Sequence, residues 1–384
     1  MAVKLANYSE PALNRYLHNR ARVHGVPLSG NFELTPCCNL QCRMCYVRQD
    51  YAQVQAQGGL TNAQQWLEWG QQAAEKGMLF LLLTGGEPLT HPQFKEIYTG
   101  LKKMGLMISL NTNGTLIDDD MVEFFCADAP TRINITLYGS SWHTYEKLCG
   151  HGDAYEKAIR AIRTLSDRGI NVKINFSATP SNADDMADVF QIADECGANV
   201  QAAPYMFPGI RRNRQFEEGD RFDPEQAGYA QIQCDRLRYT ETQFLHRVEE
   251  IESGKMMPDM TDECLDQPAE RISCRAGRSS FWITWNGRMA PCGMMTRPQV
   301  DLRACGFEKA WQDIRMQAEQ IFLPAKCVQC SARAVCHVCP AAILAETGRF
   351  DKAPSYLCSM TDAYLRHLKK MAGEMKEKQY GNQA

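Results

Sequence analysis

The sequence lacks any continuous apolar stretch of about 18 residues, which is the length that a transmembrane helix needs. Its first residues, Met-Ala-Val-Lys-Leu-Ala-Asn-Tyr, also lack the apolar run of a signal peptide. There is no excess of positive charge, because 42 Lys and Arg against 45 Asp and Glu leave a net charge of -3. These absences argue against a membrane protein and a secreted protein, and they give no electrostatic reason to expect a nucleic-acid partner. We therefore expect a cytoplasmic protein.

Cysteine, in contrast, is abundant, with 17 residues in a chain of 384. In a reducing compartment so many thiols more often serve as metal ligands than as a disulfide framework. The length suggests two or three domains, and a hydrophobic content of 44% is sufficient for real cores.

Three of these cysteines, Cys38, Cys42 and Cys45, stand in the spacing C-x3-C-x2-C. Three thiolates on one short loop can hold three irons of a four-iron cluster and leave the fourth iron open to bind a further molecule. Chance, a zinc site and scattered core thiols are the alternatives, but zinc sites favour paired C-x2-C units that together supply four ligands, and no second pair lies nearby. Cys37 is out of register and is interpreted as a bystander.

After the first thirty residues, short runs of β-forming residues alternate with amphipathic stretches. The expected strands are 31–35, 79–84, 107–111, 132–137, 171–177 and 199–203. The expected helices are 61–76, 92–103, 118–126, 153–168 and 182–196, the first with Thr61 as its N-cap. Six such units in a row predict a parallel sheet with helices outside, and the loops that follow the strands then form the active face. The Cys38 loop follows the first strand, so it falls on that face.

The turns after the second and third strands carry further candidates. Gly85 and Gly86 let the backbone approach a ligand closely, and the carboxylate of Glu87 can accept a hydrogen bond from an ammonium group. Asn113, before Gly114, could line the same mouth or belong to an ordinary Asn-Gly turn.

Alternation along the fourth and fifth strands places polar residues on one face. Asn134, Thr136 and Tyr138 should share a face of the fourth strand, and Asn175 and Ser177 a face of the fifth. No Asp or Glu stands out as a catalytic base, so the catalytic residues are left unassigned.

The cysteine triplet, followed by Tyr46, resembles the cluster-binding loop of the radical S-adenosylmethionine (radical SAM) superfamily. The resemblance implies a partial (β/α)6 TIM-like barrel, a [4Fe-4S] cluster with an open iron, and S-adenosylmethionine bound to that iron. Electron transfer from the cluster would break a carbon–sulfur bond and give a 5′-deoxyadenosyl radical. It implies that the Gly-Gly-Glu segment receives the methionine amino group. The cofactor-binding candidates are then Gly85, Gly86, Glu87, Asn113, Thr136, Tyr138, Asn175 and Ser177.

A second set of cysteines occupies the C-terminal third. Cys274 and Cys292 flank an aromatic strand and the dipeptide Asn286-Gly287, which is a strong hairpin signal and would bring both thiols to the open end of the hairpin. The remaining thiols follow as Cys327-x2-Cys330-x5-Cys336-x2-Cys339 and, after a gap, Cys358. Two zinc sites are the alternative to iron-sulfur clusters here.

This layout resembles the SPASM extension of radical SAM proteins, although two residues rather than three separate Cys336 from Cys339. The resemblance implies that Cys327, Cys330, Cys336 and Cys358 hold a distal auxiliary cluster. Cys274, Cys292 and Cys339 would hold a proximal one, with Cys264 or an open position as its fourth ligand.

We expect four segments: an N-terminal helical or extended part (1–30), the partial barrel (31–215), a bridge (216–263) and the SPASM domain with a β-hairpin and an amphipathic closing helix (264–384). Arg211, Arg212 and Arg214 lie close together, and they either are solvated or bind a substrate carboxylate near the barrel mouth. The other thiols are interpreted as packing residues: Cys126, Cys149, Cys196, Cys234 and Cys305.

The segment 137–150 also resembles the stretch after strand four in radical SAM enzymes that modify peptides. We therefore expect a peptide maturase that removes hydrogen from a residue of a ribosomally made precursor and installs a crosslink or another oxidative modification. The alternatives are formylglycine formation of the anaerobic sulfatase-maturase type, a small-molecule radical dehydrogenase or epimerase, and a non-catalytic iron-sulfur electron carrier.

The expected partners are the precursor peptide and a flavodoxin or ferredoxin as electron donor. Only 37 residues precede Cys38, too few for the leader-recognition domain of many relatives. Leader recognition would then need a separate leader-binding protein, another surface of this protein, or no leader at all.

Overall fold

The computed structural model describes residues 12–209, 211, 216–217, 219–254, 274–336 and 338–381. Its centre is a nine-stranded sheet with the order β6-β5-β4-β3-β2-β1-β7-β8-β9. The strands from β6 to β1, and β7 beside β1, are parallel, and the sheet is open rather than a closed barrel. The six strands of the first part are β1 (Ser29–Glu33), β2 (Phe80–Thr84), β3 (Met107–Thr112), β4 (Arg132–Thr136), β5 (Val172–Ser177) and β6 (Asn199–Ala203). All six predicted strands are confirmed.

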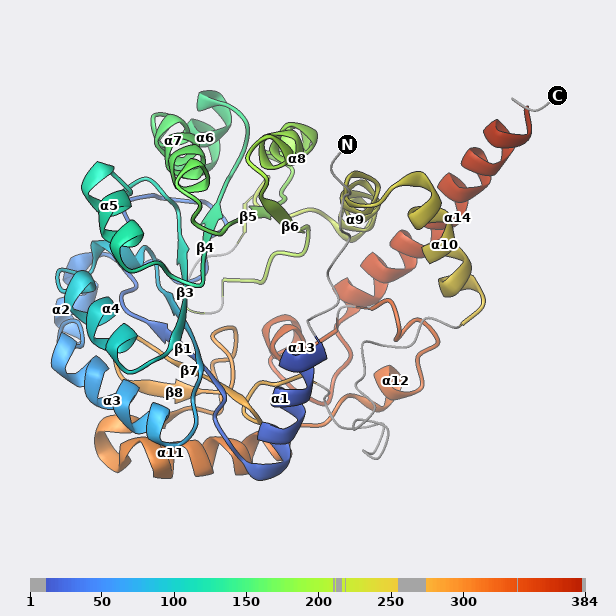
Figure 1. The fold of residues 1–384 in the computed structure, drawn as a ribbon. Coiled ribbons are helices and arrows are strands. Elements are labelled where there is room, and N and C mark those ends of the chain that lie inside the picture. Colours follow the sequence, from blue (N-terminus) through green and yellow to red (C-terminus); the bar gives the residue numbers. More distant parts are fainter. Residues whose placement is uncertain are drawn as a thin grey trace.

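Helices cover the outer side of this curved sheet (Figure 1). In the first part of the chain they are α1 (Ala12–His24), α2 (Tyr51–Ala56), α3 (Ala63–Glu75), α4 (Phe94–Lys103), α5 (Asp119–Ala127), α6 (Trp142–Cys149), α7 (Ala154–Asp167) and α8 (Met186–Glu195), with short 3-10 turns η1 (Pro88–Thr90) and η2 (Ala183–Asp185). The prediction of Thr61 as N-cap of α3 was wrong, because the side chain of Asn62 accepts the hydrogen bond from the Gln65 backbone. Thr61 instead donates its hydroxyl to the carbonyl of Trp285 at 2.7 Å.

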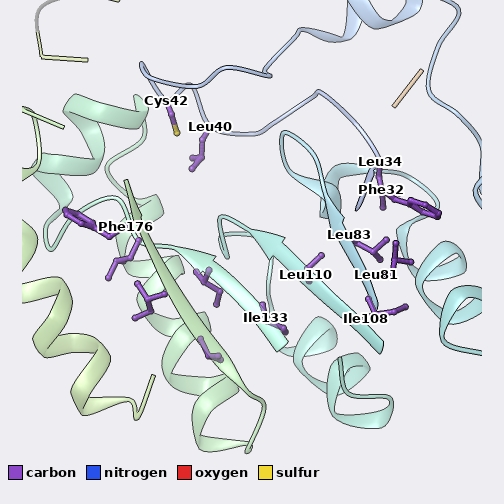
Figure 2. Packing of buried hydrophobic residues seen from close by; sticks show 14 of the residues in the cluster. Phe32, Leu34, Leu40, Cys42, Leu81, Leu83, Ile108, Leu110, Ile133 and Phe176 are labelled. Carbon is purple, nitrogen blue, oxygen red and sulfur yellow. The ribbon is translucent and has the colours of Figure 1, made fainter. Parts of the chain in front are cut away.

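The two faces of the parallel sheet differ in chemistry. Leu81, Leu83, Ile108 and Ile133 are buried in the large apolar cluster with the outer helices. Figure 2 shows these side chains on neighbouring strands, with Cys42 on the loop above them in this view. The alternate positions are mainly polar, and together with Phe80, Leu82 and Met107 they line a cavity of about 550 Å³. The interior of a closed TIM barrel is usually filled by branched apolar side chains. The inner face of this open sheet instead leaves space for a ligand.

The C-terminal part extends the same sheet. It contains α9 (Pro224–Arg238), α10 (Glu241–Glu252), β7 (Ser280–Ile283), β8 (Arg288–Ala290), β9 (Val300–Asp301), α11 (Leu302–Glu319), α12 (Ala325–Val328), α13 (Pro340–Thr347) and α14 (Ser355–Gly381). The predicted Asn286-Gly287 hairpin is confirmed as the antiparallel pair β7–β8. The sequence did not predict that β7 pairs in parallel with β1, with Phe32 opposite Ile283. The thiol-rich part is therefore joined to the first six strands through a shared sheet.

The closing helix α14 packs along α9 and α10, with Phe244, Val248 and Leu368 in a second apolar cluster. The hydroxyl of Tyr364 donates to Asp235 at 2.9 Å within this contact. Among the described helices, none combines the length and the apolar character that a membrane crossing requires.

Truncation of Phe281 in β7 tests the joint between the two parts. Its ring is fully buried and lies 5.2 Å from the Phe307 ring centroid and 5.9 Å from that of Trp311. We expect Phe281→Ala to lower the free energy of unfolding by about 3–5 kcal/mol, measured by urea denaturation. Met316→Ala, at a side chain that is 58% exposed, should change it by less than about 0.5 kcal/mol. Equal effects of the two variants would contradict this role of Phe281.

The buried His18 of α1 makes stability depend on pH. Its Nδ1 lies 2.9 Å from the Ser279 hydroxyl, and burial lowers its pKa to about 4 from 6.5. Between these values the unfolded chain binds more protons than the native protein, so the free energy of unfolding rises with pH from about 4 to 6.5 and is lost on acidification. Urea titrations over this range should show a shallower dependence for His18→Gln and an unchanged one for His246→Gln, whose side chain is exposed. Parallel curves for wild type and His18→Gln would contradict the assignment.

Candidate iron-sulfur and cofactor site

The Cys38 loop follows β1 and is held by backbone hydrogen bonds on two sides. The amide of Gly86 donates to Thr35 O at 2.7 Å, and the amide of Glu87 donates to Cys37 O at 2.8 Å. On the other side, the amide of Gln41 donates to Cys149 O at 2.9 Å, at the end of α6. The loop is thus fixed between the turn after β2 and the helix after β4.

Close approach explains the two glycines of that turn. A Cβ atom at Gly85 would lie 2.4 Å from Thr35 O, and one at Gly86 would lie 2.4 Å from Cys37 O. The absence of a side chain at these two positions therefore allows the backbone of the cysteine loop to approach the turn closely. Both glycines also line a cavity with Cys42 and Cys45, so their contact with a cofactor stays a prediction.

Glu87 has a different environment from the one expected. Its carboxylate accepts hydrogen bonds from the Leu89 amide at 3.1 Å, the Thr112 hydroxyl at 2.8 Å and the Asn113 amide at 2.7 Å. The side chain is fully buried, and burial raises its pKa to about 7 against these three bonds. The carboxylate therefore ties the end of β2 to the end of β3 and is already engaged within the protein.

Several donors point at the sulfur atoms of the loop. The Leu40 amide lies 3.4 Å from Cys38 Sγ, the Arg48 amide lies 3.4 Å from Cys45 Sγ, and Asn113 Nδ2 lies 3.6 Å from Cys38 Sγ. Such hydrogen bonds favour the thiolate form that iron requires and tune cluster potentials. The donor set of the loop therefore fits an iron-sulfur cluster, and Asn113 acts on the sulfur rather than only lining the mouth.

Cys42 is the most buried of the three thiols. A hydrogen bond with Cys149, followed by burial, raises its pKa well above the usual value, while a hydrogen bond from Tyr138 acts in the opposite direction. Cys149 was predicted to be a packing residue, and its buried side chain does pack in the core. Its contact with a cluster ligand was missed, because nothing local in the sequence relates α6 to the cysteine loop.

Most predicted cofactor-binding residues converge on two adjoining cavities. The first, of about 340 Å³, lies against Cys42 and Cys45 and is lined by Gly85, Gly86, Asn113, Thr136, Tyr138 and Ser177 among others. The second is the 550 Å³ cavity inside the curved sheet, which Thr136, Asn175 and Ser177 also line. The shared face predicted for Asn134 and Thr136 is confirmed. Glu87 is the exception, since its side chain points away into the protein.

Sequence reasoning missed a buried ion pair beside this cavity. Arg211 Nη1 donates to both carboxylate oxygens of Glu33 at 2.7 and 2.8 Å, and the Trp282 indole donates to the same carboxylate at 3.0 Å. The guanidinium also lies over the ring of Tyr46. Arg211 is therefore paired within the protein, and Arg212 and Arg214 lie outside the described residues. A single acidic residue in a buried strand was the only signal for this pair.

The structure also gathers the C-terminal thiols into the two predicted groups. Cys274, Cys292 and Cys339 surround a small apolar cluster, and burial, followed by the neighbouring Cys274 and Cys339, raises the pKa of Cys292 to about 11. The Met294 amide donates to Cys292 Sγ at 3.5 Å, and the Ala342 amide donates to Cys339 Sγ at 3.4 Å. Cys264, the possible fourth ligand, lies outside the described residues.

The distal group contains Cys327, Cys330, Cys336 and Cys358. Burial raises the pKa of Cys327, and the charges of the other three thiols add to that shift. In the described part of the chain, no three His, Cys, Asp or Glu side chains are arranged to hold one metal ion. The assignment of individual ligands stays a prediction.

Gly86→Ala tests the contact between the turn and the cysteine loop. The added Cβ would meet Cys37 O, so we expect a lower free energy of unfolding by about 1–3 kcal/mol and less iron bound per chain after reconstitution. Gly373→Ala in α14 is the matched control, because its Cβ would meet nothing within 4 Å. Iron content that stays at the wild-type level in Gly86→Ala would refute the proposed docking.

Comparisons with known proteins agree with this site. The model of the radical SAM superfamily matches residues 32–193. An AdoMet-dependent heme synthase of Methanosarcina barkeri is 25% identical over 338 residues, which is 85% of this chain and 94% of that protein. The sporulation killing factor maturation protein SkfB of Bacillus subtilis is 24% identical over 293 residues, 76% of this chain and 66% of its own length.

Among solved structures, Streptococcus suis SuiB bound to its precursor peptide SuiA superimposes with a TM-score of 0.66 at 16% identity and covers 90% of this chain and 80% of that chain. That likeness concerns the fold. The matched residues 32–193 contain the Cys38 loop and the Gly-Gly-Glu turn against which it docks. Residues 32–193 therefore match the radical SAM superfamily, and the cysteine loop within them fits the [4Fe-4S] cluster and S-adenosylmethionine that this resemblance implies.

Proposed function

We propose that the protein is a peptide-modifying radical SAM enzyme with a SPASM module. It removes hydrogen from a residue of a precursor peptide and installs a crosslink or another oxidative modification. Similarity to SkfB and the fold shared with peptide-bound SuiB support this proposal.

The observation that carries the proposal is the amide-rich lining of the cavity inside the sheet. Asn31, Asn111, Asn134, Asn175 and Gln201 all line the 550 Å³ space inside the sheet. Each carboxamide offers a donor and an acceptor, which is the pattern that a peptide backbone presents. An extended peptide can therefore exchange its hydrogen bonds to water for hydrogen bonds to these side chains.

The chain's own residues position the reaction. Cys38, Cys42 and Cys45 would hold the cluster, and Gly85 and Gly86 would present backbone to the cofactor. When bound, the cluster would supply the electron that cleaves S-adenosylmethionine, and the fragment released by this cleavage would remove hydrogen from the substrate. Thr136 and Ser177 line both cavities and would orient the ligand at their junction.

The second thiol group lies near the same space. Met294, two residues after Cys292, lines both cavities. An auxiliary cluster on Cys274, Cys292 and Cys339 would therefore stand close enough to receive an electron from the modified substrate or to position it. The Cys327 group lies beyond it in the C-terminal part and would hold the distal cluster.

Similarity to AdoMet-dependent heme synthases supports a second candidate function for this protein, which is heme synthesis. Three heme synthases match this chain, and the one from Methanosarcina barkeri does so over 94% of its length. The amide-rich cavity is less suited to a flat, largely apolar macrocycle than to a peptide. We therefore rank the peptide maturase first.

Reductive cleavage of S-adenosylmethionine by the full chain tests the proposed chemistry. The anaerobically reconstituted and reduced protein should form 5′-deoxyadenosine, measured by liquid chromatography and mass spectrometry. Cys42→Ala should abolish the product, because one of the three ligands of the cluster is lost. Cys196→Ala at the end of α8 should retain wild-type formation.

The structure of the product then separates the candidate reactions. A peptide encoded beside the gene should lose two hydrogens and carry a new crosslink in its fragment spectrum, whereas an aldehyde, which oxidation of Ser would form with the same mass loss, would indicate the sulfatase-maturase type of reaction. Heme formation from a tetrapyrrole precursor, seen by absorption, would favour the second candidate. No 5′-deoxyadenosine from an iron-loaded, reduced wild-type sample would overturn the radical SAM activity itself.

A further inference from the structure

The cavity inside the sheet has a charged end that the proposed chemistry leaves unexplained. Arg132 is the first residue of β4, and Lys173 is the second residue of β5. Because β4 and β5 are parallel, with Asn134 opposite Lys173, both cations lie at the strand ends away from the cysteine loop. Both side chains line the 550 Å³ cavity.

This end carries positive charge without a matching carboxylate. None of the described residues that line the cavity is Asp or Glu. Lys173 Nζ donates to the uncharged Gln201 side chain, and Arg132 Nε is buried without a hydrogen-bond partner. An unpaired buried Nε atom and two like charges at one end of the cavity are unfavourable, so a bound anion would relieve both costs.

The titration of the lysine is consistent with that geometry. Burial, followed by the charge of Arg132, lowers the pKa of Lys173 to about 8. Lys173 is therefore mainly cationic at neutral pH, and an anion beside it would favour that charged form.

The charged end connects with the cysteine loop through the cavity. Asn111, Thr136 and Ser177 line both this cavity and the one that contains Cys42. Arg132 and Thr136 are four residues apart on one strand, which spans about 13 Å at roughly 3.3 Å per residue. A ligand of that length would reach from the cations to the side chains nearest the cluster loop.

We propose that the substrate carries a carboxylate that binds between Arg132 and Lys173, with its reacting part directed toward Cys42 and Cys45. The donors are one guanidinium and one ammonium, and the neighbouring backbone amides are used in sheet pairing. That set suits the two oxygens of a carboxylate better than the three of a phosphate. The inference rests on the proposed function, because it assigns this cavity to the substrate.

Calorimetric titration of the full-length, reconstituted protein tests the site with glutarate, its uncharged analogue glutaramide and inorganic phosphate. Glutarate should bind, and glutaramide should bind at least tenfold more weakly. Arg132→Met and Lys173→Met should each weaken glutarate binding at least tenfold. Lys157→Met, at an exposed lysine of α7, should leave it unchanged.

Each other outcome overturns the inference. Equal binding of glutarate and glutaramide by the wild type would remove the role of charge, whether or not the variants fold. Undiminished glutarate binding by either folded variant, Arg132→Met or Lys173→Met, would place the site elsewhere. Tighter binding of phosphate than of glutarate would refute the carboxylate assignment. Formation of 5′-deoxyadenosine in the same wild-type sample separates the two ideas: if it occurs without glutarate binding, only the carboxylate site fails.

Discussion

The site depends on one close backbone contact, between the Gly85-Gly86 turn and the cysteine loop. Two amide-to-carbonyl hydrogen bonds, Gly86 to Thr35 and Glu87 to Cys37, join segments that follow different strands. A Cβ atom at either glycine would lie 2.4 Å from a carbonyl oxygen that accepts one of these bonds, Thr35 O for Gly85 and Cys37 O for Gly86. The carboxylate of Glu87 then extends the same contact to the end of β3. The turn is thus a structural support of the cluster loop as well as a candidate contact of the cofactor.

The hollow interior follows from alternation along the strands. In β4, Ile133 and Ile135 are fully buried under the helices, while Arg132, Asn134 and Thr136 line the cavity. Burial of the apolar set stabilises the sheet from one side only, so the inner face need not be filled. The polar inner residues cannot close the space by packing, because their amide and hydroxyl groups require hydrogen-bond partners. Stability and a ligand cavity are therefore supplied by opposite faces of the same strands.

Local patterns predicted most of the fold and much of the site. The six strands and the hairpin at Asn286-Gly287 were accessible, because alternation and turn chemistry are local signals. The grouping of Cys339 with Cys274 and Cys292 followed from the resemblance to the SPASM extension. The pairing of β7 with β1, the ion pair between Glu33 and Arg211, and the contact of Cys149 with Cys42 were not accessible. Each joins segments far apart in the chain, and the residues involved have no neighbours in sequence that mark the partner. The hydrogen bonds of the Glu87 carboxylate to Thr112 and Asn113 were missed for the same reason, since these partners lie at the end of another strand.

The central position of β1 connects these parts. Its neighbour β2 leads into the Gly-Gly-Glu turn, and its other neighbour β7 leads into the hairpin that carries Cys292. At the end of β1, Glu33 is almost fully buried and is compensated by Arg211 and by the indole of Trp282 from β7. A buried carboxylate is costly without such partners, so β1 and β7 are held in register by a charge requirement in addition to sheet pairing. One strand therefore fixes the relative positions of the cysteine loop and the thiols of the C-terminal part, which is what electron transfer between them would need.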